Sequence, residues 1–130
     1  MIDHVSIAVR DLRKAEPFYA GVLAPLGMRK LREWPNAAIG FGKTYPEFWI
    51  NRREGMDRVG EDSGVHICLR ATDIRAVEDF HVAAIRTGGT SDGAPGVRAQ
   101  YHSGYYAAFI RDPDGNRIEA VTFLREAAEK

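Results

Sequence analysis

The sequence has few of the features that mark secreted, membrane-spanning or nucleic-acid-binding proteins. Its single cysteine, Cys68, cannot form a disulfide within the chain, so we expect a reducing, cytoplasmic setting. No apolar run approaches the roughly 18 residues that cross a membrane, and no basic leader precedes an apolar stretch at the N-terminus. The 18 basic residues are balanced by 18 acidic ones, which argues against a non-specific nucleic-acid binder. We therefore expect a small-molecule partner, with neither nucleic acid nor a membrane.

The chain contains an internal repeat with an offset of 62 residues. The segment His4–Val9 aligns with His66–Ala71, and Asp11 then aligns with Asp73. The match continues without a gap into the following helical pattern and the glycine that ends it. An ordered match of core, cap and terminator positions indicates duplication of one structural unit.

Each copy is predicted to contain a strand, a helix and three further strands. Apolar residues alternate over residues 5–9 and 65–69, which is the pattern of a half-buried strand. A helical pattern follows each strand, and the repeated aspartate is placed to cap it. Pro17 places the start of the first regular helix near Lys14. The later strands are expected at residues 28–34, 37–41, 47–51, 97–102, 105–111 and 117–123, with a loop at residues 91–96.

This element order predicts an α+β fold built from two βαβββ modules. With 45% hydrophobic and 28% charged residues, the 130-residue chain is large enough for one domain whose core needs no disulfide. We expect a single domain over residues 1–130, with module one over residues 1–58 and module two over residues 62–124.

The residues that suggest chemistry are two histidines at equivalent positions of the repeat. A pseudo-twofold arrangement would place the first strands side by side and direct both imidazoles, His4 and His66, into one concavity. The last strand of the second copy adds Glu119, and we take Glu47 as its counterpart in the first copy. Neutral imidazoles with carboxylates are donors that divalent metals bind. The predicted metal ligands are therefore His4, His66 and Glu119, with Glu47 as a fourth; the alternative is a set of structural or solvent-facing side chains.

Four further side chains are candidates to contact a substrate. Trp49 shares a strand face with Glu47 and would form a wall for an apolar or aromatic group, the alternative being core packing. Arg98, Tyr101 and His102 precede a strand of the second copy and are candidates to face the ligand. The alternative for these three is a solvated hairpin.

Three segments carry a resemblance to a known family, and the resemblance extends from Asp3 to Phe123. They are Asp3–Leu12 at the start, Gly64–Ile67 at the opening of the second copy, and Arg111–Glu119 near the end. The sequence resembles the vicinal oxygen chelate superfamily, which includes glyoxalase I, bleomycin resistance proteins, fosfomycin-modifying enzymes and extradiol dioxygenases. The resemblance implies a cupped, incomplete mixed β barrel with helices outside, a divalent metal in the cup, and a homodimer.

The glyoxalase-I-like branch is similar in length and in ligand types. It implies a metal-dependent lyase or isomerase acting on a small oxygen-bearing metabolite, with zinc, nickel, iron or manganese as the divalent ion. Glu119 or Glu47 would then also act as the catalytic base. Two alternatives stay open. Two histidines and one glutamate form the facial triad of iron oxygenases, as in an extradiol-type dioxygenase, and a metal-free, bleomycin-resistance-like protein would use the same cup to sequester a ligand.

Overall fold

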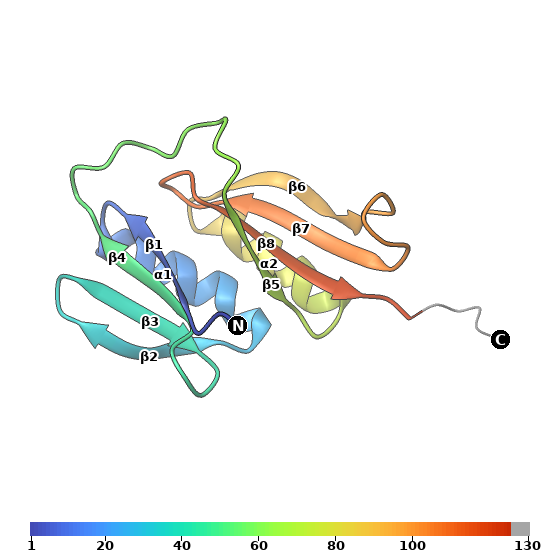
Figure 1. Ribbon diagram of the computed structural model, residues 1–130, viewed down its shortest axis with the longest axis horizontal. Helices are drawn as coiled ribbons and strands as arrows, with labels where there is room; N and C mark the ends of the chain where they lie inside the picture. Colours follow the sequence, from blue (N-terminus) through green and yellow to red (C-terminus); the bar gives the residue numbers. More distant parts are fainter. Residues whose placement is uncertain (126–130) are drawn as a thin grey trace.

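The computed structural model describes residues 1–125 and shows two βαβββ modules in tandem (Figure 1). The first module contains β1 (Val5–Val9), α1 (Leu12–Leu23), the short 3-10 helix η1 (Ala24–Leu26), β2 (Arg29–Trp34), β3 (Ala38–Gly42) and β4 (Phe48–Arg52). The second contains β5 (His66–Arg70), α2 (Ile74–Arg86), β6 (Thr90–Val97), β7 (Tyr105–Arg111) and β8 (Arg117–Phe123). The predicted limits of the domain and its modules stay predictions.

Each module forms its own open, mixed sheet of four strands. The strand orders are β1-β4-β3-β2 and β5-β8-β7-β6, so the two sheets have the same topology. The first strand of each module runs parallel to the last, and the remaining pairs are antiparallel. Figure 1 shows both helices on one side of the sheets. The predicted α+β class with two tandem modules is confirmed.

The two helices begin where the repeated aspartates cap them. Asp11 accepts a hydrogen bond from the backbone N–H of Arg13, and Asp73 accepts one from Ala76. The prediction of a late start for the first helix was wrong, because α1 begins at Leu12 and contains Pro17. A helix tolerates one missing N–H donor when the packing of its apolar face outweighs the loss.

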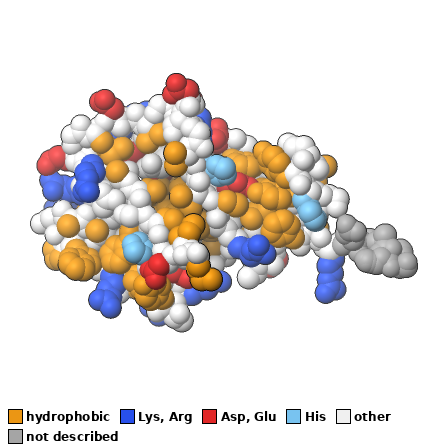
Figure 2. Space-filling view, in the orientation of Figure 1, with side chains coloured by type: hydrophobic (Ala, Val, Ile, Leu, Met, Phe, Trp, Pro, Cys, Tyr) orange, Lys and Arg blue, Asp and Glu red, His pale blue; other side chains and the backbone are white. Residues whose placement is uncertain are grey.

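The helices pack on the sheets and on each other. The apolar face of α1 buries Phe18, Val22 and Leu23 completely, and each such side chain contributes about 1.5–3 kcal/mol when fully buried. Gly21 faces α2, where an added Cβ would lie 3.8 Å from Ala83. Figure 2 shows that hydrophobic side chains also gather on the opposite, sheet side of the molecule. Among residues 1–125, no helix is long and apolar enough to cross a membrane.

Strand β6 occupies a segment that the sequence predicted to be mainly a loop. It covers residues 90–97 rather than 97–102. Its pairing with β7 shifts register between Ser91 and Gly93 and again between Gly93 and Gly96. Such irregularities let a glycine-rich segment join a sheet, because bulges absorb the residues that do not fit the ladder.

The turn between β7 and β8 connects the second module to the first. Asp112 accepts hydrogen bonds from the backbone N–H of Asp114 at 2.9 Å and of Asn116 at 2.8 Å. Its other oxygen accepts one from the Tyr19 hydroxyl of α1 at 2.6 Å. The Asn116 amide donates to the Ala8 carbonyl of β1 at 2.9 Å. The predicted turn therefore forms and also holds the modules together.

The bond between Tyr19 and Asp112 is buried. Tyr19 is 0% exposed and Asp112 is 1% exposed. Burial, followed by the charge of Asp112, raises the pKa of Tyr19 well above its usual value, so the hydroxyl stays protonated and donates. If the Tyr19 hydroxyl is removed, the buried Asp112 carboxylate loses one hydrogen-bond partner. This loss is costly because the acceptor is charged.

Replacing Tyr19 by Phe is expected to lower the free energy of unfolding by about 1–3 kcal/mol, because the ring still packs but the bond to Asp112 is lost. Urea denaturation measures the change. Tyr101→Phe is the control and should change stability by less than about 0.5 kcal/mol, since Tyr101 is 61% exposed. Equal effects of the two substitutions would contradict the role given to this bond.

Candidate functional site

In the second module, β5 and β8 bring a histidine and a carboxylate together. Their parallel register pairs His66 with Arg117 and Cys68 with Glu119, so His66 and Glu119 lie on the same sheet face. His66 Nε2 lies 3.1 Å from Glu119 Oε1. The Tyr105 hydroxyl of β7 donates to the other oxygen, Oε2, at 2.6 Å. Glu119 is 2% exposed and His66 about half exposed, so the pair has a buried and an open end.

This pair fits the geometry of two donors to one divalent ion. Donors at about 2.0–2.2 Å from an ion lie roughly 3.0–3.5 Å apart, from octahedral to tetrahedral angles. Desolvation and the bond to Glu119 raise the pKa of Tyr105, which therefore remains a hydroxyl donor to the carboxylate. Desolvation, followed by the charge of Glu119, raises the pKa of Cys68 to about 12, so the thiol is protonated in the metal-free protein.

In the first module, the ends of two parallel strands place His4 beside Glu47. Val5 of β1 pairs with Phe48 of β4, and the Val5 N–H donates to the Glu47 carbonyl at 3.0 Å. The residues that precede these strands, His4 and Glu47, are therefore level with each other. His4 Nδ1 also lies 2.7 Å from a carboxylate oxygen of Asp3.

The strand register corrects the assumed symmetry between Glu47 and Glu119. In the second module Glu119 pairs with Cys68, and in the first module the equivalent pair is Trp49 with Ser6. The counterpart of Glu119 is therefore Trp49. Glu47 lies two residues earlier, because the offset of the repeat does not persist into the last strand. The equivalence drawn from the sequence was wrong by two positions, although both residues share one face.

We call His4 with Glu47, and His66 with Glu119, the two half-sites. They lie apart within one chain. His4, Glu47 and His66 line one open cavity of about 370 Å³. The Ala8 carbonyl of β1 is bonded to Asn116, next to the residue that pairs with His66. His66 is thus level with the end of β1, whereas His4 precedes its start, so the two histidines lie toward opposite ends of this strand. Among residues 1–125, no three His, Cys, Asp or Glu side chains form a group that could hold a metal.

Trp49 lies flat on the first sheet, at the register position that Glu119 occupies in the second. An added Cβ at Gly40 of β3 would lie 2.9 Å from three atoms of the Trp49 ring. Trp49, Trp34 and Tyr45 line a neighbouring cavity of about 430 Å³. The indole is half-buried between sheet and cavity, so it both packs and forms a wall.

The other three substrate-binding candidates lie on the segment before β7. The Arg98 guanidinium donates to the carbonyls of Gly96 at 2.8 Å and Ala94 at 2.7 Å, and so holds its own loop. Tyr101 is exposed, and its ring meets the Tyr105 ring edge-on at 5.1 Å. His102 Nδ1 accepts a hydrogen bond from the Gly104 N–H at 3.0 Å. Tyr101 therefore contacts the half-site through Tyr105, and the roles of all three stay predictions.

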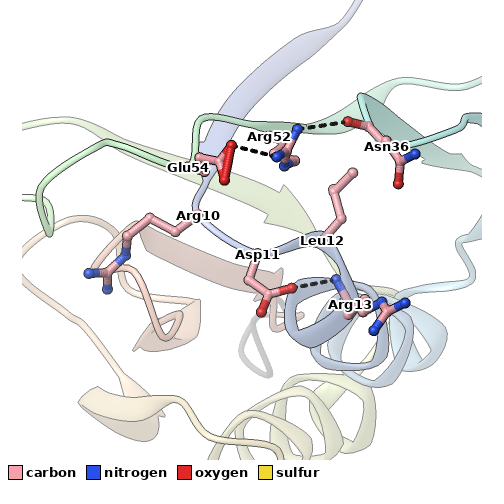
Figure 3. Close-up of a pocket in the computed structure, with 7 residues that line it drawn as sticks. All are labelled: Arg10, Asp11, Leu12, Arg13, Asn36, Arg52 and Glu54. Carbon is pink, nitrogen blue, oxygen red and sulfur yellow. Dashed lines mark hydrogen bonds and ion pairs between the residues drawn. The ribbon is translucent and has the colours of Figure 1, made fainter.

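The larger cavity in Figure 3, of about 500 Å³, lies at the start of α1 and contains none of the predicted site residues. Two of its three arginine side chains have acidic partners. Arg52 is 2.6 Å from Glu54, and Arg10 is 2.7 Å from Asp114. Asp11 occupies the helix N-terminus itself. The cavity therefore offers an anion little uncompensated positive charge.

Residues 1–120 match the model of the Glyoxalase/Bleomycin resistance protein/Dioxygenase superfamily. The chain belongs to this superfamily. A probable lactoylglutathione lyase from Synechocystis sp. is 32% identical over 127 residues, covering 91% of this chain and 92% of the relative. The resemblance found in the sequence is confirmed.

Solved structures of superfamily members support the fold. A glyoxalase/bleomycin resistance protein from Albidiferax ferrireducens superposes with a TM-score of 0.80 at 28% identity, over 94% of this chain and 98% of the other. A lactoylglutathione lyase from Agrobacterium tumefaciens gives a TM-score of 0.62 at 20% identity, over 94% and 92%. At that identity the second likeness concerns the fold alone.

Sequence reasoning missed three side chains that support the candidate ligands. Tyr105 holds Glu119, Asp3 contacts His4, and Tyr45 donates a hydrogen bond to Asp3. The signal for Tyr105 was present in the alternation of β7, which puts Tyr105 on the face of Glu119, four residues before Phe109, the residue that pairs with Glu119. Tyr45 had no such signal, because it lies in a loop whose path depends on tertiary contacts.

Replacing Gly40 by Ala is expected to displace the Trp49 ring and to destabilise the protein by about 1–3 kcal/mol, because the methyl group would overlap the indole. Tryptophan fluorescence and urea denaturation report the two effects. Gly64→Ala is the matched control, since nothing lies within 4 Å of an added Cβ there. An unchanged spectrum in Gly40→Ala would mean that Trp49 does not rest on β3.

Proposed function

We propose that this superfamily member is a metal-dependent enzyme that acts on a small metabolite with neighbouring oxygen atoms. The observation that carries the proposal is the His66–Glu119 pair, with its donors 3.1 Å apart and its carboxylate held by Tyr105. His4, at the equivalent position of the other module, is the third donor. The single cysteine supports a cytoplasmic location.

Each residue of this set has a distinct role. A divalent zinc, nickel, iron or manganese ion would stabilise negative charge that develops on the substrate oxygens. His4, His66 and Glu119 would hold the ion. Glu119, nearly excluded from water, is also the group to accept a proton from a substrate carbon, and the Tyr105 hydroxyl keeps its oxygens oriented. Trp49 would exclude water beside the reacting atoms.

The lead reaction class is that of a lyase or isomerase, supported by the relative named a probable lactoylglutathione lyase. One observation favours a second class. Trp49 is the counterpart of Glu119, and a donor set without Glu47 contains two histidines and one carboxylate, the set used by iron oxygenases. Metal-free ligand sequestration, supported by the aromatic cavity, is the remaining alternative.

Metal analysis tests the proposal directly. Wild-type protein is dialysed separately against each of the four metals and then against metal-free buffer. It is expected to keep about one ion per site. His66→Ala and Glu119→Gln should bind the ion at least 10-fold more weakly. His81→Ala is the control, since His81 faces Ser91 on the far side of the sheet. Glu47→Gln distinguishes a three-donor site from a four-donor site. A small loss of metal affinity supports three donors, and a loss equal to that of Glu119→Gln supports four.

The metal retained selects the assay. Iron with oxygen uptake on catechols would support the oxygenase class, and nickel or zinc with isomerisation of hemithioacetals would support the lyase class. A wild-type protein that binds none of the four metals would overturn the metal-dependent function and leave ligand sequestration.

We also infer that the protein works as a homodimer whose sites combine His4 of one chain with His66 and Glu119 of another. The separation of His4 and His66 within the chain supports this arrangement. Large apolar side chains also stay exposed, among them Trp34 at 61%, Val65 at 71% and Phe123 at 43%. A twofold dimer would give two equivalent sites.

Mixing two inactive variants distinguishes shared sites from sites within one chain. His4→Ala and His66→Ala, unfolded together in urea and refolded, should regain about a quarter of the wild-type metal capacity, because half of the dimers are mixed and each mixed dimer contains one intact site. Each variant refolded alone is the control. Mixing without any recovery would place all ligands of a site in one chain.

A further inference from the structure

The loop before β4 makes a contact that the function above does not use. The Tyr45 hydroxyl donates to both carboxylate oxygens of Asp3, at 2.8 and 3.0 Å. One of these oxygens, Oδ1, lies 2.7 Å from His4 Nδ1. An ionised carboxylate only accepts hydrogen bonds, so Nδ1 of a neutral His4 must carry the proton. The other ring nitrogen, Nε2, then keeps a free lone pair.

We propose that Asp3 and Tyr45 form a clamp that positions His4 so that Nε2 is the atom presented to a metal ion. The inference rests on the proposed function, because it concerns the same ion. Neither clamp residue would touch the ion or the substrate; both act through His4. A ligating histidine whose second nitrogen is fixed by a carboxylate binds its metal 10–100-fold more tightly than one left unsupported.

The second module supports the choice of nitrogen independently. There, Nε2 of His66 is the atom that lies 3.1 Å from Glu119 Oε1. If His66 and Glu119 share an ion, the donor atom of His66 is Nε2. The clamp would give His4, at the equivalent position of the first module, the same donor atom.

The backbone of the loop explains how Tyr45 reaches Asp3. An added Cβ at Gly42 would lie 1.8 Å from the Tyr45 carbonyl oxygen, so the chain folds tightly back on itself there. The Glu47 N–H donates to the Phe41 carbonyl at 2.9 Å and closes the loop. This closure directs Tyr45 toward the start of β1. Asp3 and His4 are 62% and 52% exposed, so water competes with the clamp and the effect lies toward the lower end of the range.

The tautomer of His4 in the metal-free protein is the first readout. Long-range ¹H–¹⁵N spectra are expected to show that the neutral imidazole of wild-type His4 is protonated at Nδ1. Asp3→Ala should shift the population toward protonation at Nε2, which is the preferred form of free imidazole. Asp57→Ala removes the same charge from an exposed linker position and should leave the His4 signals unchanged. A tautomer unaffected by Asp3→Ala would overturn the clamp.

The affinity for Zn²⁺, measured by competition with a chromophoric chelator, is the second readout. Asp3→Ala is expected to weaken binding about 10-fold, Tyr45→Phe by less, and Asp3→Asn by an intermediate amount, because its amide oxygen still accepts from Nδ1. In a His4→Ala background, Asp3→Ala should cause no further loss, whereas a general effect of charge would persist.

The two proposals fail in different ways. If wild type binds none of the four metals, the proposed function fails, and the tautomer alone decides whether Asp3 orients His4. If wild type binds Zn²⁺ and Asp3→Ala binds it equally well, the clamp fails and the proposed function stands. Circular dichroism of each variant confirms that the fold is intact.

Discussion

The buried hydrogen bond from the Tyr19 hydroxyl to the Asp112 carboxylate couples the two modules, and the positions of the candidate site residues depend on that coupling. It joins the helix of the first module to the turn between the last two strands of the second. The same turn holds the end of β1 through Asn116. Asp112 is satisfied by side-chain and backbone donors together, which is what permits a carboxylate in the core.

This coupling determines where the half-sites lie. With the end of β1 fixed beside the start of β8, His66 is level with that end and His4 lies at the other. Each half-site is completed within its own sheet, by Glu119 and Tyr105 in one module and by Asp3 and Tyr45 in the other. The arrangement divides a duplicated set of donors between two separate sheet faces.

The two modules have diverged although their topology is the same. At equivalent register positions, one module has Glu119 and the other has Trp49. The carboxylate in the second module is held by a tyrosine of the same sheet, whereas the tyrosine of the first module holds Asp3. One module thus has a charged, hydrogen-bonded residue at the position where the other has an aromatic one.

The sequence by itself determined the duplicated βαβββ order, the aspartate caps, the turn at residues 112–116 and the superfamily, because each depends on residues close together in the chain. It could not determine that Pro17 lies inside α1 or that residues 90–97 form β6, since packing and bulges override local preference there. Only the tertiary structure decided that Trp49 matches Glu119, because strand register is a long-range pairing. For the same reason, only the tertiary structure separated His4 from His66 and brought Tyr45 to Asp3.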